Sequence, residues 1–373
     1  MTERIIIRGY YGFANLGDDI LLKVTYQLVK ECFPGSEILV CSNSASDNSY
    51  IASILGESIN IIRDDNPLKV NWIIDGGGGV YFDFKRGNLK FFLLNTVIHL
   101  LGFTFFKSLY KAYRKFKNNT GITSAGRIGL GIGVGSYTYS SARFFSDIIS
   151  LSDYDFLLVR DEESANQVIR YGFSYTLKTA TDLAFLTQYW LAGNKMPSSA
   201  GNCVGFILRD WNYKNQIDFD AIEQTAQLLQ QAGIPILFFS LDGNTDRIYK
   251  ERFSNVSMIE WNPERITVTE FMQKLAQCKL VVTSRAHGAI LSACINIPSI
   301  CLAIEDKLVR VSEMLHKSSV LIQLPLQTSV LTQVVLSQLR KEGLEDCVRE
   351  DVLRNQAVME AGIVSLKEFL KGN

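Results

Sequence analysis

An arginine and a histidine lie close together in the segment 284–288, where a β-strand is expected to lead into a helix. The apolar run 279–283 predicts a buried strand, and residues 286–294 predict the helix that follows. In open α/β sheets, ligands bind at such turns, outside the carboxyl ends of the strands. The guanidinium of Arg285 can bind a carboxylate or a phosphate, and the imidazole of His287 can transfer a proton near neutral pH. The pair therefore predicts proton-transfer chemistry on an anionic substrate.

Other polar side chains follow other predicted strands. Asn15, Asp18 and Asp19 lie at the glycine-rich turn after the strand 4–8, where a helix start favours negative charge. One of the two aspartates can be explained by the helix dipole alone, but the whole run is more polar than that role requires. Lys307 follows the strand 299–303, which is the next strand after the one that leads to Arg285. Its ammonium is expected near His287, although a solvated surface lysine is an alternative.

Three further candidates come from the same argument. Arg160 ends the strand 156–159 and Arg209 ends the strand 203–208, so both guanidinium groups are expected at the carboxyl edge of a sheet. The run Gly76, Gly77, Gly78 and Gly79 follows the strand 72–75. Four glycines are costly to order, so this run predicts a cleft wall, an anion-binding loop or a tight turn.

The elements that must position these residues alternate between strand and helix along the whole chain, which predicts parallel sheets. The stretch 191–202 contains Gly193, Pro197 and Gly201 without clear periodicity and is interpreted as a linker. We therefore expect an α/β protein of two Rossmann-like domains facing a cleft, over residues 1–192 and 203–345. A C-terminal helix is expected over residues 346–373.

Composition narrows the possible partners. The 373 residues include 38 Lys and Arg and 38 Asp and Glu, so the formal net charge is zero and nucleic acid is not an expected partner. The seven cysteines form no C-x-x-C pair, which fits a reducing cytoplasm, and we see no signal peptide. No cluster has metal-ligand spacing, so no metal is expected.

The segment 91–118 is apolar and aromatic up to Phe106 and basic after it. Its apolar part is shorter than the roughly 20 residues that a membrane-spanning helix requires. We consider two interpretations: a buried core helix, or peripheral contact of an apolar and a basic face with an anionic membrane. The basic residues are Lys107, Lys111, Arg114, Lys115 and Lys117.

Several of these segments, in order, resemble the motifs of polysaccharide pyruvyl transferases. The family has a Gly-Tyr-Tyr-Gly…Asn-x-Gly-Asp-Glu start, a Gly-rich loop, Val-Arg-Asp-x-x-Ser/Thr, Ala-Asp-Pro-Ala-Phe, Arg-Leu-His and Asp-Pro-Lys. The similar segments here lie within about residues 4 to 310 and are Gly9–Asp19, Asp75–Gly78, Val159–Ser164, Thr181–Phe185, Arg285–His287 and Asp306–Lys307.

The resemblance implies a GT-B-like fold and transfer of pyruvate from phosphoenolpyruvate to a sugar, often as a ketal. It implies that Arg160, Arg285, His287 and Lys307 bind the donor. His287 is then the natural acid for the methylene carbon of the donor, and Asp18 or Asp19 is the candidate base for the sugar hydroxyl. No cofactor is expected besides the donor substrate.

The expected partner is a glycan acceptor, lipid-linked in its precursor form, and the expected location is the cytoplasm at the inner face of the membrane. Two other functions remain open at this point. One is a nucleotide-sugar glycosyltransferase of GT-B architecture, and the other is a non-catalytic glycan-binding protein.

Overall fold

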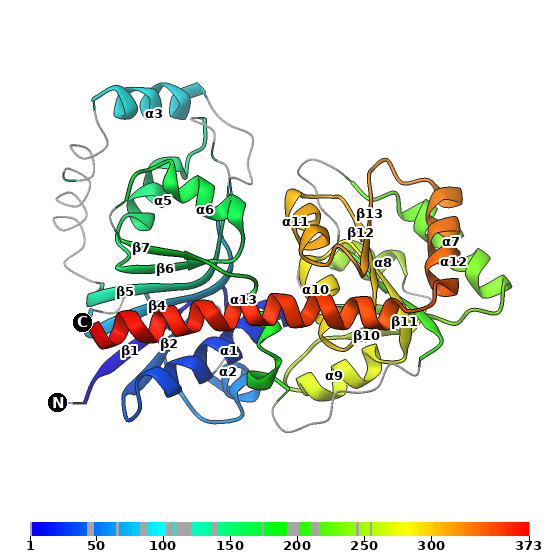
Figure 1. Ribbon diagram of the computed structural model, residues 1–373, viewed down its shortest axis with the longest axis horizontal. Coiled ribbons are helices and arrows are strands. Elements are labelled where there is room, and N and C mark those ends of the chain that lie inside the picture. Colours follow the sequence, from blue (N-terminus) through cyan, green and yellow to red (C-terminus); the bar gives the residue numbers. More distant parts are fainter. Residues whose placement is uncertain are drawn as a thin grey trace.

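The structure, a computed structural model, describes residues 2–42, 48–64, 67–82, 89–101, 108, 121–135, 137, 140–173, 175–191, 201–209, 216–243, 246–253 and 256–372. Two parallel β-sheets organise these residues, one in each half of the chain (Figure 1). The first sheet has the order β3-β2-β1-β4-β5-β6-β7, and the second has the order β10-β9-β8-β11-β12-β13. Both orders follow the Rossmann arrangement, so the predicted fold of two Rossmann-like α/β domains is confirmed.

The first domain is built on strands β1 (Arg4–Arg8), β2 (Glu37–Cys41), β3 (Asn60–Ile62), β4 (Leu68–Tyr81), β5 (Ile122–Val134), β6 (Phe156–Val159) and β7 (Thr176–Thr179). The second domain is built on strands β8 (Cys203–Ile207), β9 (Ile236–Ser240), β10 (Met258–Glu260), β11 (Cys278–Thr283), β12 (Ser299–Leu302) and β13 (Ser319–Ile322).

Helices cover both faces of the first sheet. On one face, the core includes side chains of α1 (Leu16–Cys32), α2 (Asn48–Leu55) and α13 (Leu344–Gly372). On the other face, it includes side chains of α5 (Phe144–Leu151) and α6 (Glu162–Ile169). The helices of the second domain are α7 (Phe219–Gln231), α8 (Arg247–Arg252), α9 (Val268–Leu275), α10 (Ala286–Cys294), α11 (Asp306–Met314) and α12 (Thr328–Arg340).

Local sequence explains where several helices start. The carboxylate of Asp161 accepts a hydrogen bond of 2.7 Å from the backbone of Ser164, which fixes the first turn of α6. Thr267 and Glu270 form the reciprocal bonds of a capping box at the start of α9. The side chain of Asn15 caps α1 in the same way by accepting from Gly17 N at 3.1 Å.

Strand β4 continues through the glycine run, so the prediction that the strand ends at Asp75 is wrong. Gly76 pairs with Leu130 of β5, and Gly79 pairs with Gly133. A Cβ on Gly76 would collide with the side chains of Tyr11 and Thr25. Glycine therefore extends this strand because neighbouring side chains occupy the volume that its own would fill, although glycine normally weakens a strand.

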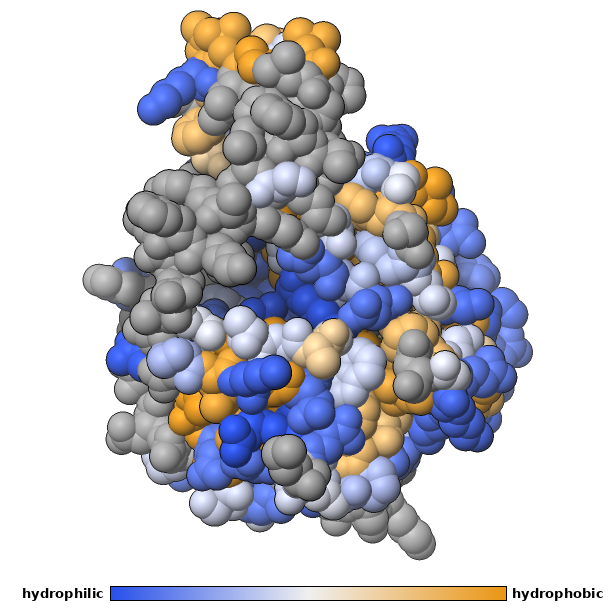
Figure 2. Space-filling view, turned by 90° about the vertical axis from the view of Figure 1, so that its left-hand side faces the viewer, coloured by the Kyte–Doolittle hydropathy of each residue, from blue (hydrophilic) through white to orange (hydrophobic). Residues whose placement is uncertain are grey.

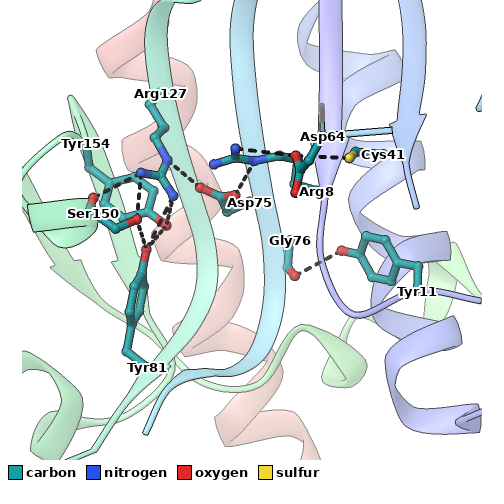
Figure 3. Close-up of polar contacts among 10 residues, drawn as sticks. All are labelled: Arg8, Tyr11, Cys41, Asp64, Asp75, Gly76, Tyr81, Arg127, Ser150 and Tyr154. Atoms are coloured by element: carbon teal, nitrogen blue, oxygen red, sulfur yellow. Dashed lines mark hydrogen bonds and ion pairs between the residues drawn. The ribbon is translucent and has the colours of Figure 1, made fainter. Parts of the chain in front are cut away.

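A buried carboxylate joins the three central strands of the first sheet (Figure 3). Asp75 on β4 accepts hydrogen bonds from Arg8 on β1 at 3.1 Å and from Arg127 on β5 at 2.6 Å. Arg127 also lies over the ring of Tyr154, 4.3 Å from its centroid. Burial opposes the charge of Asp75, but the two arginines outweigh it and lower its pKa to about 2. The carboxylate therefore stays charged across the physiological range.

The two domains meet through backbone and side-chain contacts. Leu16 N donates to Leu241 O at 2.9 Å, and Asn15 forms an antiparallel bridge with Asp242. Helix α13 runs along both domains (Figure 1). Its Asp351 accepts hydrogen bonds from the backbone and hydroxyl of Ser318 in the second domain. Further along, its Gly362 lies against Leu158 of the first sheet.

Helix α3 (Leu89–Leu101) lies at the outer end of the first domain, where hydrophobic side chains form the top of the molecule in Figure 2. The alternative of a buried core helix is wrong for its described part, since five large apolar side chains are exposed. The rest of the predicted membrane-contact segment, apart from residue 108, lies outside the described residues. Within the described part of the chain, no helix is long and apolar enough to cross a membrane. The exposed side chains are Leu89, Phe92, Leu93, Val97 and Leu100.

Candidate active site

Residues from the carboxyl ends of both sheets meet between the domains. His287 lies in the first turn of α10, and Lys307 lies in the first turn of α11. Arg160 follows β6, and Asp18 lies in the first turn of α1. The predicted strand, turn and helix around His287 are present, because β11 ends at Thr283 and α10 begins at Ala286.

Three glycines of the first domain lie directly beneath the ionisable side chains. A Cβ on Gly17 would collide with the imidazole of His287. A Cβ on Gly79 would lie 2.5 Å from Nζ of Lys307, and one on Gly133 would lie 2.6 Å from Nε of Arg160. His287 and Lys307 belong to the second domain, so their contacts with Gly17 and Gly79 also join the two domains.

Phe82, directly after β4, brings three positive groups together. Nζ of Lys307 lies 4.5 Å from the ring centroid, and the guanidinium carbons of Arg160 and Arg310 each lie 5.8 Å from it. Arg310 was not among the residues predicted from the sequence. It follows Lys307 by three positions on α11, a spacing that places both side chains on one helix face and could have indicated it.

Burial and neighbouring positive charge both act on the pKa of the Lys307 ammonium. Burial lowers the pKa of the Lys307 ammonium to about 8; Glu305 opposes this shift, and Arg160 and Arg209 reinforce it. Nε of Arg310 lies 3.6 Å from the Asp161 carboxylate, and Nε of Arg160 lies 3.5 Å from the same oxygen. The three positive groups around Phe82 are therefore suited to bind an anion.

Asp182 of the first domain lies opposite His287. Its Oδ2 lies 3.7 Å from Nε2 of His287, and its Oδ1 accepts from Ala184 N at 3.0 Å. Burial disfavours the charge of Asp182, yet His287 and Arg160 outweigh burial and lower its pKa. Asp182 belongs to the family-like segment Thr181–Phe185, but no role for it was predicted from the sequence. Its contact with His287 joins residues more than 100 positions apart.

The two aspartates at the start of α1 have different surroundings. Burial raises the pKa of Asp18, and His287 and Lys307 oppose that shift, so Asp18 lies within electrostatic reach of both. Asp19 instead accepts hydrogen bonds from Tyr50 at 2.6 Å and from Trp261 of the second domain at 2.8 Å. Burial raises the pKa of Asp19 to about 7. The structure therefore brings Asp18 to the cluster and places Asp19 in the domain contact.

Two further predicted residues, Arg285 and Arg209, are paired with acidic side chains of the second domain. Arg285 is paired within the second domain: its Nε donates to Asp246 at 3.1 Å, and a terminal nitrogen lies 3.7 Å from Asp242. Arg209 lies 3.6 Å from Glu305.

Of the predicted glycines, Gly78 lies nearest to Asp18. A Cβ on Gly78 would lie 3.4 Å from Oδ1 of Asp18. Gly76 and Gly77 pack against the interior side chains of Tyr11, Thr25, Leu21 and Leu183. No group of three or more metal-ligating side chains occurs among the described residues.

Comparison with known protein families identifies the chain. The family model for polysaccharide pyruvyl transferase matches residues 15–306. The chain belongs to the polysaccharide pyruvyl transferase family. The match spans the start of α1, the glycine strand, Arg160, Asp182 and His287, and it ends at Asp306. No curated protein sequence matches this pyruvyl transferase family member.

Solved structures with low sequence identity share the fold of this pyruvyl transferase family member. The UDP complex of MnaA from S. aureus has a TM-score of 0.60 and 11% identity, covering 94% of this chain and 91% of that chain. UDP-GlcNAc 2-epimerase from Methanocaldococcus jannaschii has a TM-score of 0.55 and 13% identity, covering 92% and 94%. A glycosyltransferase from Rickettsia africae has a TM-score of 0.53 and 9% identity, covering 100% and 99%. These neighbours confirm the GT-B-like fold.

Gly17→Ala is expected to displace the His287 ring, because the added methyl would occupy the position of the imidazole. The chain has three histidines, so a carbon–proton correlation spectrum can follow each imidazole. We expect the His287 signal to shift and the other two to stay. Gly243→Ala is the control, since the added methyl would lie 3.8 Å from Cβ of Ala14, which is an ordinary van der Waals contact. An unchanged His287 signal in the folded Gly17→Ala protein would contradict the contact.

Proposed function

We propose that this pyruvyl transferase transfers pyruvate from phosphoenolpyruvate to a sugar of a polysaccharide or its precursor, forming a ketal. The observation that carries the proposal is the group of positive side chains around Phe82. Asp18 is within electrostatic reach of both Lys307 and His287, so the imidazole belongs to the same site. Phosphoenolpyruvate has a phosphate and a carboxylate, and guanidinium and ammonium groups are suited to bind both. Arg160, Lys307, Arg285 and His287 form the proposed donor site, and we add Arg310 to it.

The proposed chemistry uses His287 as the acid. His287 gives a proton to the methylene carbon of the donor, which becomes a methyl group, and a sugar hydroxyl adds to the adjacent carbon. The carbon–oxygen bond to phosphate then breaks, and inorganic phosphate leaves with the bonding electrons. A second hydroxyl of the sugar attacks the resulting oxocarbenium ion and closes the ketal, and its proton passes to the departing phosphate, which leaves as hydrogen phosphate. The proton that the base takes from the first hydroxyl replaces, through exchange with solvent, the proton that His287 gave. The balance is one phosphoenolpyruvate and one diol giving one ketal and one phosphate, with no cofactor.

We assign Asp18 as the base that takes the proton of the attacking hydroxyl. Its burial raises its pKa, which makes it a better proton acceptor than an exposed aspartate. Arg285 contributes to donor binding in this scheme if the donor carboxylate replaces Asp242, 3.7 Å away, as its partner. Asn15, Gly78 and Arg209 border the acceptor side.

We further propose that the acceptor is lipid-linked and that the enzyme works in the cytoplasm at the inner face of the membrane. The exposed apolar side chains of α3 support this, because the basic residues that follow in the sequence complement anionic headgroups. The seven cysteines are all free, which suits a reducing compartment. Helix α3 is the proposed contact with the lipid surface.

The proposal is tested by incubating the protein with phosphoenolpyruvate and a panel of glycans. We expect phosphate release that depends on the acceptor. His287→Gln is expected to lower kcat about 10²–10⁴-fold while leaving the Kd for phosphoenolpyruvate within a few-fold. His316→Gln is the matched control, since the side chain of His316 is 56% exposed and its charged neighbour is Asp351 of α13, which is not part of the proposed site. Consumption of nucleotide sugars instead of phosphoenolpyruvate would favour the glycosyltransferase alternative.

Phosphoenolpyruvate affinity is expected to fall as the pH rises through about 8, because Lys307 is charged below that pH and neutral above it. Losing a charged partner should weaken binding about tenfold between pH 7 and pH 9.5, measured by calorimetry. Lys307→Arg should remove this dependence, since arginine stays protonated over the range. Equal pH dependence in both proteins would exclude Lys307 as its source.

Membrane contact is tested by sedimentation with vesicles that contain anionic phospholipid. We expect binding to these vesicles, weaker binding to neutral phosphatidylcholine vesicles, and loss of binding in the double variant Leu93→Asp and Leu100→Asp. Leu353→Asp on α13 is the control, because Leu353 is 58% exposed but lies on a different surface. A double variant that binds like the unmodified protein would rule out α3.

A further inference from the structure

We propose that Tyr10 and Phe13 form a stacking platform for a pyranose ring of the acceptor. This inference rests on the proposed function and adds to it the place where the sugar binds. The two residues belong to the loop 9–15 between β1 and α1. Nothing in the donor chemistry requires them.

The two rings lie parallel at the surface. Their centroids are 4.1 Å apart and their planes differ by 13°. Tyr10 remains 60% exposed, although Phe13 covers one of its faces. An exposed aromatic ring that is already ordered by stacking offers a large apolar area at a low cost in side-chain entropy.

The loop that carries the platform is fixed at both ends. Tyr11 lies between Tyr10 and Phe13 in the sequence. Its side chain is buried, and its hydroxyl donates to Gly76 O at 2.9 Å. At the other end, Asn15 caps α1 and bridges to Asp242 of the second domain. Gly12 and Ala14 have positive φ angles of 81° and 58°. A positive φ at a residue other than glycine is uncommon and is typical of functional sites.

The platform borders the proposed catalytic groups. Burial raises the pKa of the Tyr10 phenol, Asp242 and Asp18 add to the shift, and Arg209 opposes it. These three charged side chains therefore lie within electrostatic reach of the phenol. The loop leads directly into Gly17, which lies under His287. The bridge from Asn15 to Asp242 and the approach of Gly243 to Ala14 hold this loop against the second domain, so we place a sugar on the exposed face of Tyr10 near the assigned base.

The chemistry of the platform suits a sugar and not the donor. One face of a pyranose carries C–H groups that pack on the negative face of an aromatic ring, while its hydroxyls remain at the rim for polar partners. The π face repels an anion such as phosphoenolpyruvate. The positive groups around Phe82 and the stacked rings of Tyr10 and Phe13 therefore divide the site into a donor part and an acceptor part.

The test compares the full chain with Tyr10→Ala, Tyr10→Phe and Phe92→Ala. Saturation-transfer NMR uses methyl β-D-glucopyranoside and methyl β-D-galactopyranoside as probes, in the presence of phosphoenolpyruvate. We expect saturation on one C–H face of a pyranoside in the unmodified protein and in Tyr10→Phe. Tyr10→Ala should weaken pyranoside binding about five- to tenfold. Phe92→Ala removes an exposed aromatic ring on α3 and should change nothing.

Two results would overturn the platform: unchanged pyranoside binding in Tyr10→Ala, or no saturation of either probe in the unmodified protein. Calorimetry with phosphoenolpyruvate alone measures donor binding, and this tests the proposed function separately from the platform. Intact donor binding in Tyr10→Ala is expected. Failure of the unmodified protein to bind the donor would count against the proposed function, while the pyranoside result would stand independently.

Discussion

The candidate site depends on three places where the backbone carries no side chain. Gly17, Gly79 and Gly133 leave the volumes that His287, Lys307 and Arg160 occupy. Because His287 and Lys307 come from the second domain, they reach these positions only when the two domains are in contact. Domain contact and assembly of the site are therefore one event, and any motion that opens the domains also removes the His287 imidazole and the Lys307 ammonium from the first domain.

The glycine strand needs support that its own residues cannot give. That support comes from Asp75, whose carboxylate holds Arg8 and Arg127 and thereby joins β1, β4 and β5 just before the run begins. The ring of Tyr154 lies beneath Arg127, and its hydroxyl accepts from the same guanidinium at 3.3 Å. A saturated ionic network of this kind keeps the strand in register although four successive residues contribute no side-chain packing of their own.

The sequence predicts those features that follow from local rules. Alternating apolar runs identify the two sheets, and the turn after 279–283 places His287 at a carboxyl edge, because strand, cap and helix signals are all local. Asp182, Phe82 and Asp246 acquire their roles through contacts between distant segments, which no spacing rule reaches. The predicted strand ended at Asp75 because glycine has a low strand propensity. In the structure, β4 continues because neighbouring side chains override that propensity. The apolar composition of α3 was compatible with both a core helix and a membrane-contact helix, and only the structure shows that five of its large apolar side chains are exposed.

Helix α13 has a consequence for biosynthesis. It follows the whole second domain in the chain, yet its Phe369 packs against Phe156 of the first sheet, with ring centroids 5.3 Å apart. Its backbone also accepts a 2.7 Å hydrogen bond from Thr181, the neighbour of Asp182. The first domain therefore leaves the ribosome long before the helix that covers one face of its sheet. During translation α1 and α2 can already pack on that face, but the part that α13 covers stays exposed until the second domain has been made, so the first domain completes its core last.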